Sequence, residues 1–305
     1  MKKILILLSI ILFISACVNF PGLSGSGGKE GIIFDFIENM PPTTSLYEEQ
    51  SFKVGLNIAN YATIPVKTQV CISDTPGDAF GGIPSSVCEF VEMRKAEEGD
   101  KIIPDEKEVY FPTKTGIYSY SNIEGDMTTN IIAEVSYPYE TQASAQLCIK
   151  TDQNIKTPIA CEMSENLKLS YLYDAPIKIT SLKKDIFPRS DDEIEVMLNM
   201  DIQNSGSGEV LNFKDAYIPL TANKDVLLDY SIELVGLTSD FKCTPLESGK
   251  ILLKQNRKTL ICSATLNKRD LGQEYLTNPL KIRIKYAYKQ MKSLGSISLV
   301  GREEI

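Results

Sequence analysis

The sequence of 305 residues contains no histidine and no tryptophan. Without histidine it can form no Ser/His/Asp triad and no Cys/His nucleophile pair, and it lacks the most common side-chain metal ligand. Its net charge is −8, and its Lys and Arg residues are scattered rather than gathered into the basic stripe that nucleic acid requires. We therefore predict a non-enzymatic protein with no catalytic residue, cofactor, metal ion or nucleic-acid partner.

The remaining composition is that of an ordinary globular protein, with 43% hydrophobic and 24% charged residues. A chain of this length most often forms two domains. No long segment keeps the 3.6-residue hydrophobic period of an amphipathic helix. The sequence instead favours a fold built from β-strands.

The N-terminus has the three parts of an export signal. Lys2 and Lys3 form a basic start, an apolar run follows from Ile4 to Ile14, and small residues precede Cys17. This run is too short for a membrane-spanning helix, which needs about 20 apolar residues. We predict that residues 1–16 are a signal peptide and that the protein is exported.

The segment Ile14-Ser15-Ala16-Cys17 resembles the lipobox of prokaryotic lipoproteins. The resemblance implies that Cys17 is the lipid attachment site and that the membrane is a partner through this lipid, since two or more acyl chains give a stable anchor. The alternatives are an uncleaved signal anchor with a free Cys17 thiol, or an ordinary cleaved signal. Residues 17–31 are rich in Gly and Ser and are predicted to be a flexible tether.

Six cysteines remain after Cys17, which is an even number suited to disulfides in an oxidising compartment. They fall into three close couples: Cys71 and Cys88, Cys148 and Cys161, and Cys243 and Cys262. Six cysteines allow fifteen disulfide connectivities, and sequence alone cannot choose among them. We favour the connectivity that joins the two cysteines of each couple. A zinc site is disfavoured because there is no CxxC spacing and no histidine.

Short runs of alternating polar and apolar residues predict strands, and their spacing predicts an all-β sandwich fold. The clearest runs are Ser51–Asn60, Val66–Ser73, Asn130–Tyr137, Ala143–Lys150, Glu193–Gln203, Ser231–Leu237, Thr259–Leu266, Lys281–Tyr288 and Ser296–Val300. We expect Tyr137-Pro-Tyr139 and Tyr286-Ala-Tyr288 each to begin a hairpin. Tyrosines spaced two residues apart lie on one face of a strand, and the chain has four such pairs: these two, Tyr118 with Tyr120, and Tyr171 with Tyr173. We expect them to pack inside the sheets. The alternative is that they form exposed tyrosine ladders that bind a partner.

The chain also carries a faint internal duplication. Val54–Asn60 aligns with Leu198–Asn204 at an offset of 144, and Tyr137 aligns with Tyr286 at an offset of 149. Similar offsets at both ends of the two copies indicate two related modules. We predict a first domain over residues 32–174 and a second over residues 175–305.

These repeated segments resemble a known class of surface module. The stretch Glu48–Asn60, its counterpart ending Ile202–Gly206, and Tyr137–Thr141 are similar to parts of CARDB-like and other immunoglobulin-like modules of prokaryotic, especially archaeal, surface lipoproteins. The resemblance implies two tandem immunoglobulin-like β-sandwich domains with a role in adhesion or as a scaffold for binding. It transfers no catalytic residue.

Other local patterns carry little chemistry. Ser181–Lys184 matches SxxK, but Ser181 is expected in a strand rather than at the helix N-terminus that acyl transfer requires. The acidic groups within residues 97–108 and 191–195 are expected to be solvated hairpin tips. The loop Asp74–Pro84, with Phe80 near its tip, either crosses the end of a sandwich or engages a partner.

The sequence as a whole predicts a lipid-anchored protein of the cell surface that acts in adhesion, envelope organisation or binding of a protein or glycan partner. The alternative is a surface subunit that binds a solute or glycan for a transporter or enzyme. A glycosidase that uses carboxylates alone ranks third, because such enzymes need no histidine.

Overall fold

A computed structural model describes residues 31–301 except 43, 78, 98–101, 114, 157–160, 219–225, 239, 245–249, 254–255 and 273. The predicted signal peptide, Cys17 and the tether as far as residue 30 lie outside the described residues. The first half of the body contains β1 (Ile32–Phe36), β2 (Ser45–Tyr47), β3 (Val54–Asn60), β4 (Val66–Asp74), β5 (Val87–Met93), β6 (Asp105–Phe111), β7 (Asp126–Lys150), β8 (Ser164–Asn166) and β9 (Leu169–Tyr171).

The second half contains two short 3-10 helices among its strands. These elements are β10 (Ile177–Pro188), β11 (Glu193–Asn204), β12 (Glu209–Leu211), η1 (Phe213–Asp215), β13 (Val226–Leu234), β14 (Lys242–Thr244), β15 (Lys250–Leu253), β16 (Arg257–Asn267), η2 (Lys268–Leu271) and β17 (Tyr275–Val300). The described part of the chain is therefore an all-β protein, as the sequence predicts.

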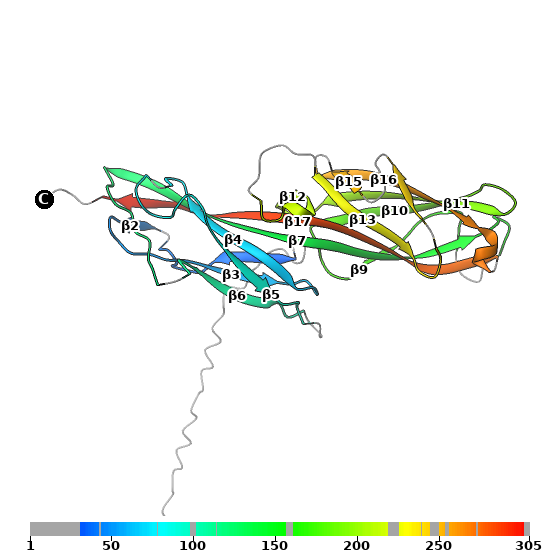
Figure 1. Ribbon diagram of the computed structural model, residues 1–305, viewed down its shortest axis with the longest axis horizontal. Coiled ribbons are helices and arrows are strands. Elements are labelled where there is room, and N and C mark those ends of the chain that lie inside the picture. The colour runs from blue at the N-terminus through cyan, green and yellow to red at the C-terminus, as the bar shows by residue number, and fades with distance from the viewer. Residues whose placement is uncertain are drawn as a thin grey trace, which may run out of the picture.

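Two long strands run through the whole body as one antiparallel ribbon (Figure 1). β7 has 25 residues and β17 has 26, and they pair from Tyr275 opposite Lys150 to Val300 opposite Asp126. At 3.2–3.4 Å per residue, this ribbon is about 80 Å long. It gives the molecule an elongated shape.

The continuity of β7 corrects the sequence interpretation. We expected separate strands at Asn130–Tyr137 and Ala143–Lys150 with a hairpin starting at Tyr137, but β7 passes straight through Pro138. The hairpin expected at Tyr286 is wrong for the same reason, because Lys281–Tyr288 and Ser296–Val300 both belong to the single strand β17. The neighbouring strand β4 pairs with β7 only up to Ser136, and β9 pairs with it only from Ala143. Pro138 therefore lies where one edge of β7 is unpaired, a position that tolerates proline.

Three sheets are stacked into sandwiches around this ribbon. The shared sheet has nine strands and runs in the order β15-β13-β17-β7-β4-β5, with β2, β9 and β12 attached beside it. A three-stranded sheet, β1-β3-β6, packs against its N-terminal part, and a five-stranded sheet, β14-β16-β11-β10-β8, packs against its C-terminal part. Alternate residues of facing strands, such as Leu56 and Val135, fill one continuous buried core.

The proposed boundary between residues 174 and 175 stays a prediction, and strand pairing crosses it. Lys289 to Val300 of β17 pair with Asp126 to Ser136 of β7, beside β4 and β2 of the first half. In the same way, the C-terminal end of β7 pairs with β9 and with the first part of β17. Each half therefore contributes a strand to the sandwich of the other half.

The internal duplication is visible in local geometry. Asn60 ends β3 and Asn204 ends β11, and each side-chain Oδ1 accepts a hydrogen bond from the backbone N–H two residues later, at 3.0 and 3.1 Å. Each Nδ2 donates to the carbonyl four residues later, at 2.9 Å in both copies. β3 pairs with β1 as β11 pairs with β10, so the two copies share a strand arrangement as well as a turn.

The six described cysteines form the three local pairs favoured by their spacing. The disulfides are Cys71–Cys88, Cys148–Cys161 and Cys243–Cys262. The first joins β4 to the edge strand β5, the third joins the edge strand β14 to β16, and the second joins β7 to the segment before β8. They fasten peripheral elements, and three disulfides indicate an extracytoplasmic protein. No helix among the described residues is long and apolar enough to cross a membrane.

Candidate functional site

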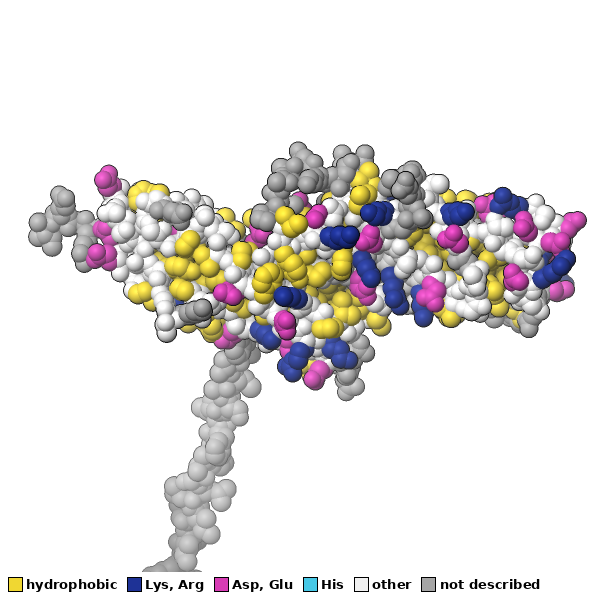
Figure 2. Space-filling model, in the orientation of Figure 1, with side chains coloured by type: hydrophobic (Ala, Val, Ile, Leu, Met, Phe, Trp, Pro, Cys, Tyr) yellow, Lys and Arg dark blue, Asp and Glu magenta, His cyan; other side chains and the backbone are white. Residues whose placement is uncertain are grey.

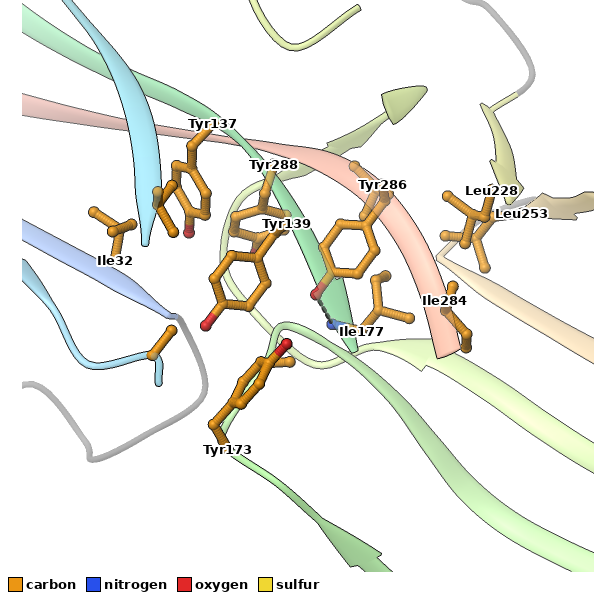
Figure 3. Packing of buried hydrophobic residues seen from close by; sticks show 14 of the residues in the cluster. Ile32, Tyr137, Tyr139, Tyr173, Ile177, Leu228, Leu253, Ile284, Tyr286 and Tyr288 are labelled. Carbon is orange, nitrogen blue, oxygen red and sulfur yellow. Dashed lines mark hydrogen bonds between the residues drawn. The ribbon is translucent and has the colours of Figure 1, made fainter. Parts of the chain in front are cut away.

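Four tyrosines meet at mid-length, where the two halves join; we call this place the waist (Figure 3). Tyr139 of β7 lies directly opposite Tyr286 of β17, and Tyr137 lies opposite Tyr288. The ring centroids of each cross-strand pair are 6.1 Å apart with an interplanar angle of 61°. Equal geometry in the two pairs shows that an approximate two-fold axis passes through the ribbon here.

These side chains are buried rather than displayed. Each of the four is at most 1% exposed, and Tyr173 packs edge-on against Tyr139 from the segment before β10. Burial raises the pKa of Tyr139 and Tyr286 well above the usual value of tyrosine. The prediction that the tyrosine pairs pack the sheets is therefore confirmed at the waist, and they form no exposed binding ladder.

The waist hydroxyl groups have partners inside the protein. The Tyr286 hydroxyl lies 3.2 Å from Thr141 Oγ1, and the Tyr288 hydroxyl accepts a 2.6 Å hydrogen bond from the Gly208 backbone N–H. Gln290 Nε2 donates to the Tyr137 hydroxyl at 3.1 Å. The bond from Gly208 connects β17 to the turn between β11 and β12, and the other two connect β17 to β7, so the waist is a structural joint.

The Gly-rich loop after β4 is held down across the end of its sandwich. Asp74 accepts hydrogen bonds from the Tyr120 hydroxyl at 2.7 Å and from the backbone N–H groups of Gly77 and Ile83 at 2.9 and 3.1 Å. Burial raises the pKa of the Asp74 carboxyl. Phe80 packs against the core rather than projecting from the tip. This geometry favours the connecting role of the loop over partner binding.

The SxxK pattern is divided between the two faces of β10. Ser181 is exposed, whereas the Lys184 side chain is fully buried and its Nζ lies 2.6 Å from Glu165 Oε1. Lys184 also donates to the backbone carbonyl of Cys148. Burial lowers the pKa of Lys184, and the neighbouring Glu165 opposes that shift. Sequence analysis missed this ion pair because its two residues lie on neighbouring strands.

The acidic segments form individual ion pairs. Asp105 is buried beside Arg94, whose guanidinium lies 2.9 Å away, so it is not part of a solvated tip as expected. In the second segment, Asp192 lies 3.4 Å from Arg269 and is exposed. No group of three or more acidic or cysteine side chains among the described residues could hold a metal ion.

A polar groove on the outer face of the five-stranded sheet is the best candidate for a binding site. Ser181, Asp201 and Thr259 lie side by side on β10, β11 and β16. The groove has a volume of about 470 Å³, and it is lined by Asp201 and Thr259 together with Thr180, Gln203 and Arg257. It therefore combines hydroxyl, amide, carboxylate and guanidinium groups within one depression.

Asp201 is the centre of this groove. Thr259 Oγ1 donates to one carboxylate oxygen and Ser181 Oγ donates to the other, each at 2.7 Å. These two hydrogen bonds, aided by the charge of Arg257, lower the pKa of Asp201. The carboxylate is therefore a fixed hydrogen-bond acceptor at neutral pH. Sequence analysis did not find the groove because its residues come from three strands and form no local motif.

Charged residues of both signs are interspersed over the half of the visible face that contains β13 and β15, and hydrophobic side chains gather near mid-length (Figure 2). This face thus carries no large area of one charge sign. Such a distribution offers little long-range attraction for a highly charged partner.

Comparisons with known proteins give no family assignment. No family model matches the chain, and no curated protein matches it. The structure of alpha-2-macroglobulin from Escherichia coli, activated by porcine elastase, aligns with 13% identity and a TM-score of 0.17. The alignment covers 91% of this chain but only 22% of that protein.

Proposed function

We propose that the protein is a lipid-anchored component of the cell surface with a non-catalytic role in adhesion, envelope organisation or partner binding. The observation that carries the proposal is a two-part β-sandwich body with three disulfides at its periphery. Disulfides of this kind stabilise proteins outside the cytoplasm. The lipobox-like segment ending at Cys17 supports attachment of this body to a membrane through lipid.

The continuous ribbon of β7 and β17 supports a mechanical or spacing role. Because both strands pass through the waist without interruption, relative movement of the two halves would break ladder hydrogen bonds or separate the buried tyrosines. A stiff body of this kind suits a surface protein that holds a partner at a fixed distance or under load.

The test is the fate of Cys17 in the native membrane fraction. We expect mass spectrometry to find lipid on an N-terminal Cys17 and to find no lipid on a Cys17→Ser variant. A Ser26→Ala variant, also in the tether but distant from the lipobox, should stay membrane-bound. An intact Met1 with unmodified Cys17 would refute the lipid anchor.

The groove around Asp201 favours one alternative, a surface subunit that binds a hydroxylated solute or glycan. The anchored Asp201 carboxylate can accept hydrogen bonds from sugar hydroxyls, and the guanidinium of Arg257 in the same groove can donate to them. A panel of glycans should then raise the melting temperature of the protein, and Asp201→Asn should abolish that rise while Asp191→Asn should not. If no glycan raises the melting temperature, this alternative is refuted.

A further inference from the structure

The chain enters the folded body at its middle and not at an end. Gly31, which directly precedes β1, lies against the waist: a Cβ atom at this glycine would fall 1.8 Å from the hydroxyl oxygen of Tyr139. Its carbonyl accepts a 2.8 Å hydrogen bond from the Tyr61 N–H, continuing the pairing of β1 with β3. Gly31, where the described chain begins, therefore lies at mid-length.

The entry point is also on a defined side of the shared sheet. The waist tyrosines and Gln290 project from the ribbon toward the smaller sheets, and Gln290 Nε2 donates to the Ile32 carbonyl at 3.0 Å. Gly31 thus lies on the side that carries the three-stranded and five-stranded sheets. The outer face of the nine-stranded sheet, which includes the exposed Lys285, lies on the opposite side.

The lengths of the ribbon and the predicted tether can be compared. From Tyr139, β7 continues to Asp126 in one direction and to Lys150 in the other, so each end of the body is about 40 Å from the waist. Residues 17–30 span at most about 50 Å when fully extended, and a Gly-rich segment of that length has a root-mean-square span of about 20 Å. Standing the body on one end would stretch such a segment to about twice this span.

We infer that the body lies lengthwise along the membrane, held at its waist, with the outer face of the nine-stranded sheet directed away from the lipid. This inference rests on the proposed lipid anchor at Cys17. In this orientation the two ends of the body lie at the same height above the membrane. The surface that faces outward is then a long side of the molecule and not one of its tips. The approximate two-fold axis at the waist is then perpendicular to the membrane plane.

The test uses the mature lipoprotein reconstituted in vesicles that contain an acceptor dye on a lipid headgroup. A single donor dye is placed on a new cysteine at Glu124→Cys, near one end, or at Asp191→Cys, near the other; both positions are exposed. Two further variants report on the waist: Asp174→Cys on the entry side and Lys285→Cys on the outer face. The native body cysteines are in disulfides and leave only the new thiol for labelling.

We expect equal energy transfer from Glu124→Cys and Asp191→Cys, with higher transfer from Asp174→Cys and lower transfer from Lys285→Cys. An upright body would place its two ends at heights that differ by about 80 Å, so transfer from one end would be several-fold higher. That result would overturn the lengthwise orientation, and equal transfer from the two waist positions would overturn the assignment of the outward face. Failure of the unlabelled protein to float with vesicles would instead overturn the lipid anchor, and this inference with it.

Discussion

The buried tyrosines of the waist should make the protein unusually sensitive to alkaline pH. Their folded-state pKa values are raised by burial, whereas a tyrosine in an unfolded chain titrates near pH 10. Their contribution to stability is fully present below pH 10. It is lost as the pH rises from 10 toward the folded-state pKa, because only the unfolded chain releases these protons.

The magnitude follows from the unfolded-state titration. At pH 11, one unit above that pKa, ionisation stabilises the unfolded state by about 1.4 kcal/mol for each tyrosine that stays protonated in the folded state. Tyr139 and Tyr286 are at most 1% exposed, so together they should account for about 3 kcal/mol of lost stability. Tyr120 and Tyr173, whose pKa values are also raised by burial, add to this loss in the parent protein.

The assay compares urea unfolding at pH 8 and pH 11, followed by circular dichroism, in a chain that begins at Gly31. The double variant Tyr139→Phe/Tyr286→Phe should be less stable than the parent at pH 8, because Tyr286 loses its hydrogen bonds to Thr141 and Ile177. Between the two pH values, however, it should lose about 3 kcal/mol less than the parent. Tyr47→Phe, at a side chain 60% exposed, serves as the control. Equal losses in the parent and the double variant would refute the reasoning.

Two further predictions concern the disulfides and the duplicated turns. Replacing Cys71 and Cys88 together by Ser should lower the free energy of unfolding by about 3 kcal/mol on the chain-entropy estimate, and limited proteolysis should then cut first at the edge strand β5. Asn60→Ala and Asn204→Ala should each cost about 2 kcal/mol, because each removes the two hydrogen bonds that the turns share and one further bond, from Asn60 to the Arg94 carbonyl or from the Tyr288 hydroxyl to Asn204. A large difference between these two costs in denaturation experiments would argue against equivalent turns.

Sequence reasoning succeeded where the signal is local. Alternating residues predicted the strands, the spacing of Cys71 and Cys88 favoured a local disulfide, and the alignment of Val54–Asn60 with Leu198–Asn204 indicated the duplication. Each of these features depends on a few neighbouring positions.

Features that depend on long-range pairing were not predictable. Nothing near Pro138 shows that β7 continues through it, because the strand is completed by β17 more than a hundred residues later. The groove around Asp201 is likewise assembled from three strands, two of them far from the third in the chain. Both the continuity of β7 and the assembly of the groove depend on which residues of distant strands pair with each other. That register could not be predicted from this sequence alone.

The approximate two-fold axis leads to a last prediction, which tests how far the halves are independent. A fragment of residues 32–174 would lose β17 and would expose one side of β7 together with Tyr137 and Tyr139. In a dimer of this fragment, β7 of a second molecule could take the place of β17. Residues of β17 correspond to residues of β7 at an offset of 149, so Tyr137 would lie opposite Tyr139 of the other molecule, and Asp126 opposite its Lys150. The C-terminal part of each β7 would then cover the N-terminal part of the other.

We therefore expect this fragment to form a symmetric dimer in light-scattering measurements and Tyr139→Glu to prevent dimerisation, because the dimer would bury its charge without a partner. The exposed change Tyr47→Phe should leave the dimer intact. A folded, monomeric fragment would show instead that the first half completes its own core, so that the shared ribbon joins two units that are already stable. A dimer would mean that the first half cannot bury Tyr137 and Tyr139 alone, which gives a physical reason for the continuous strands between the halves.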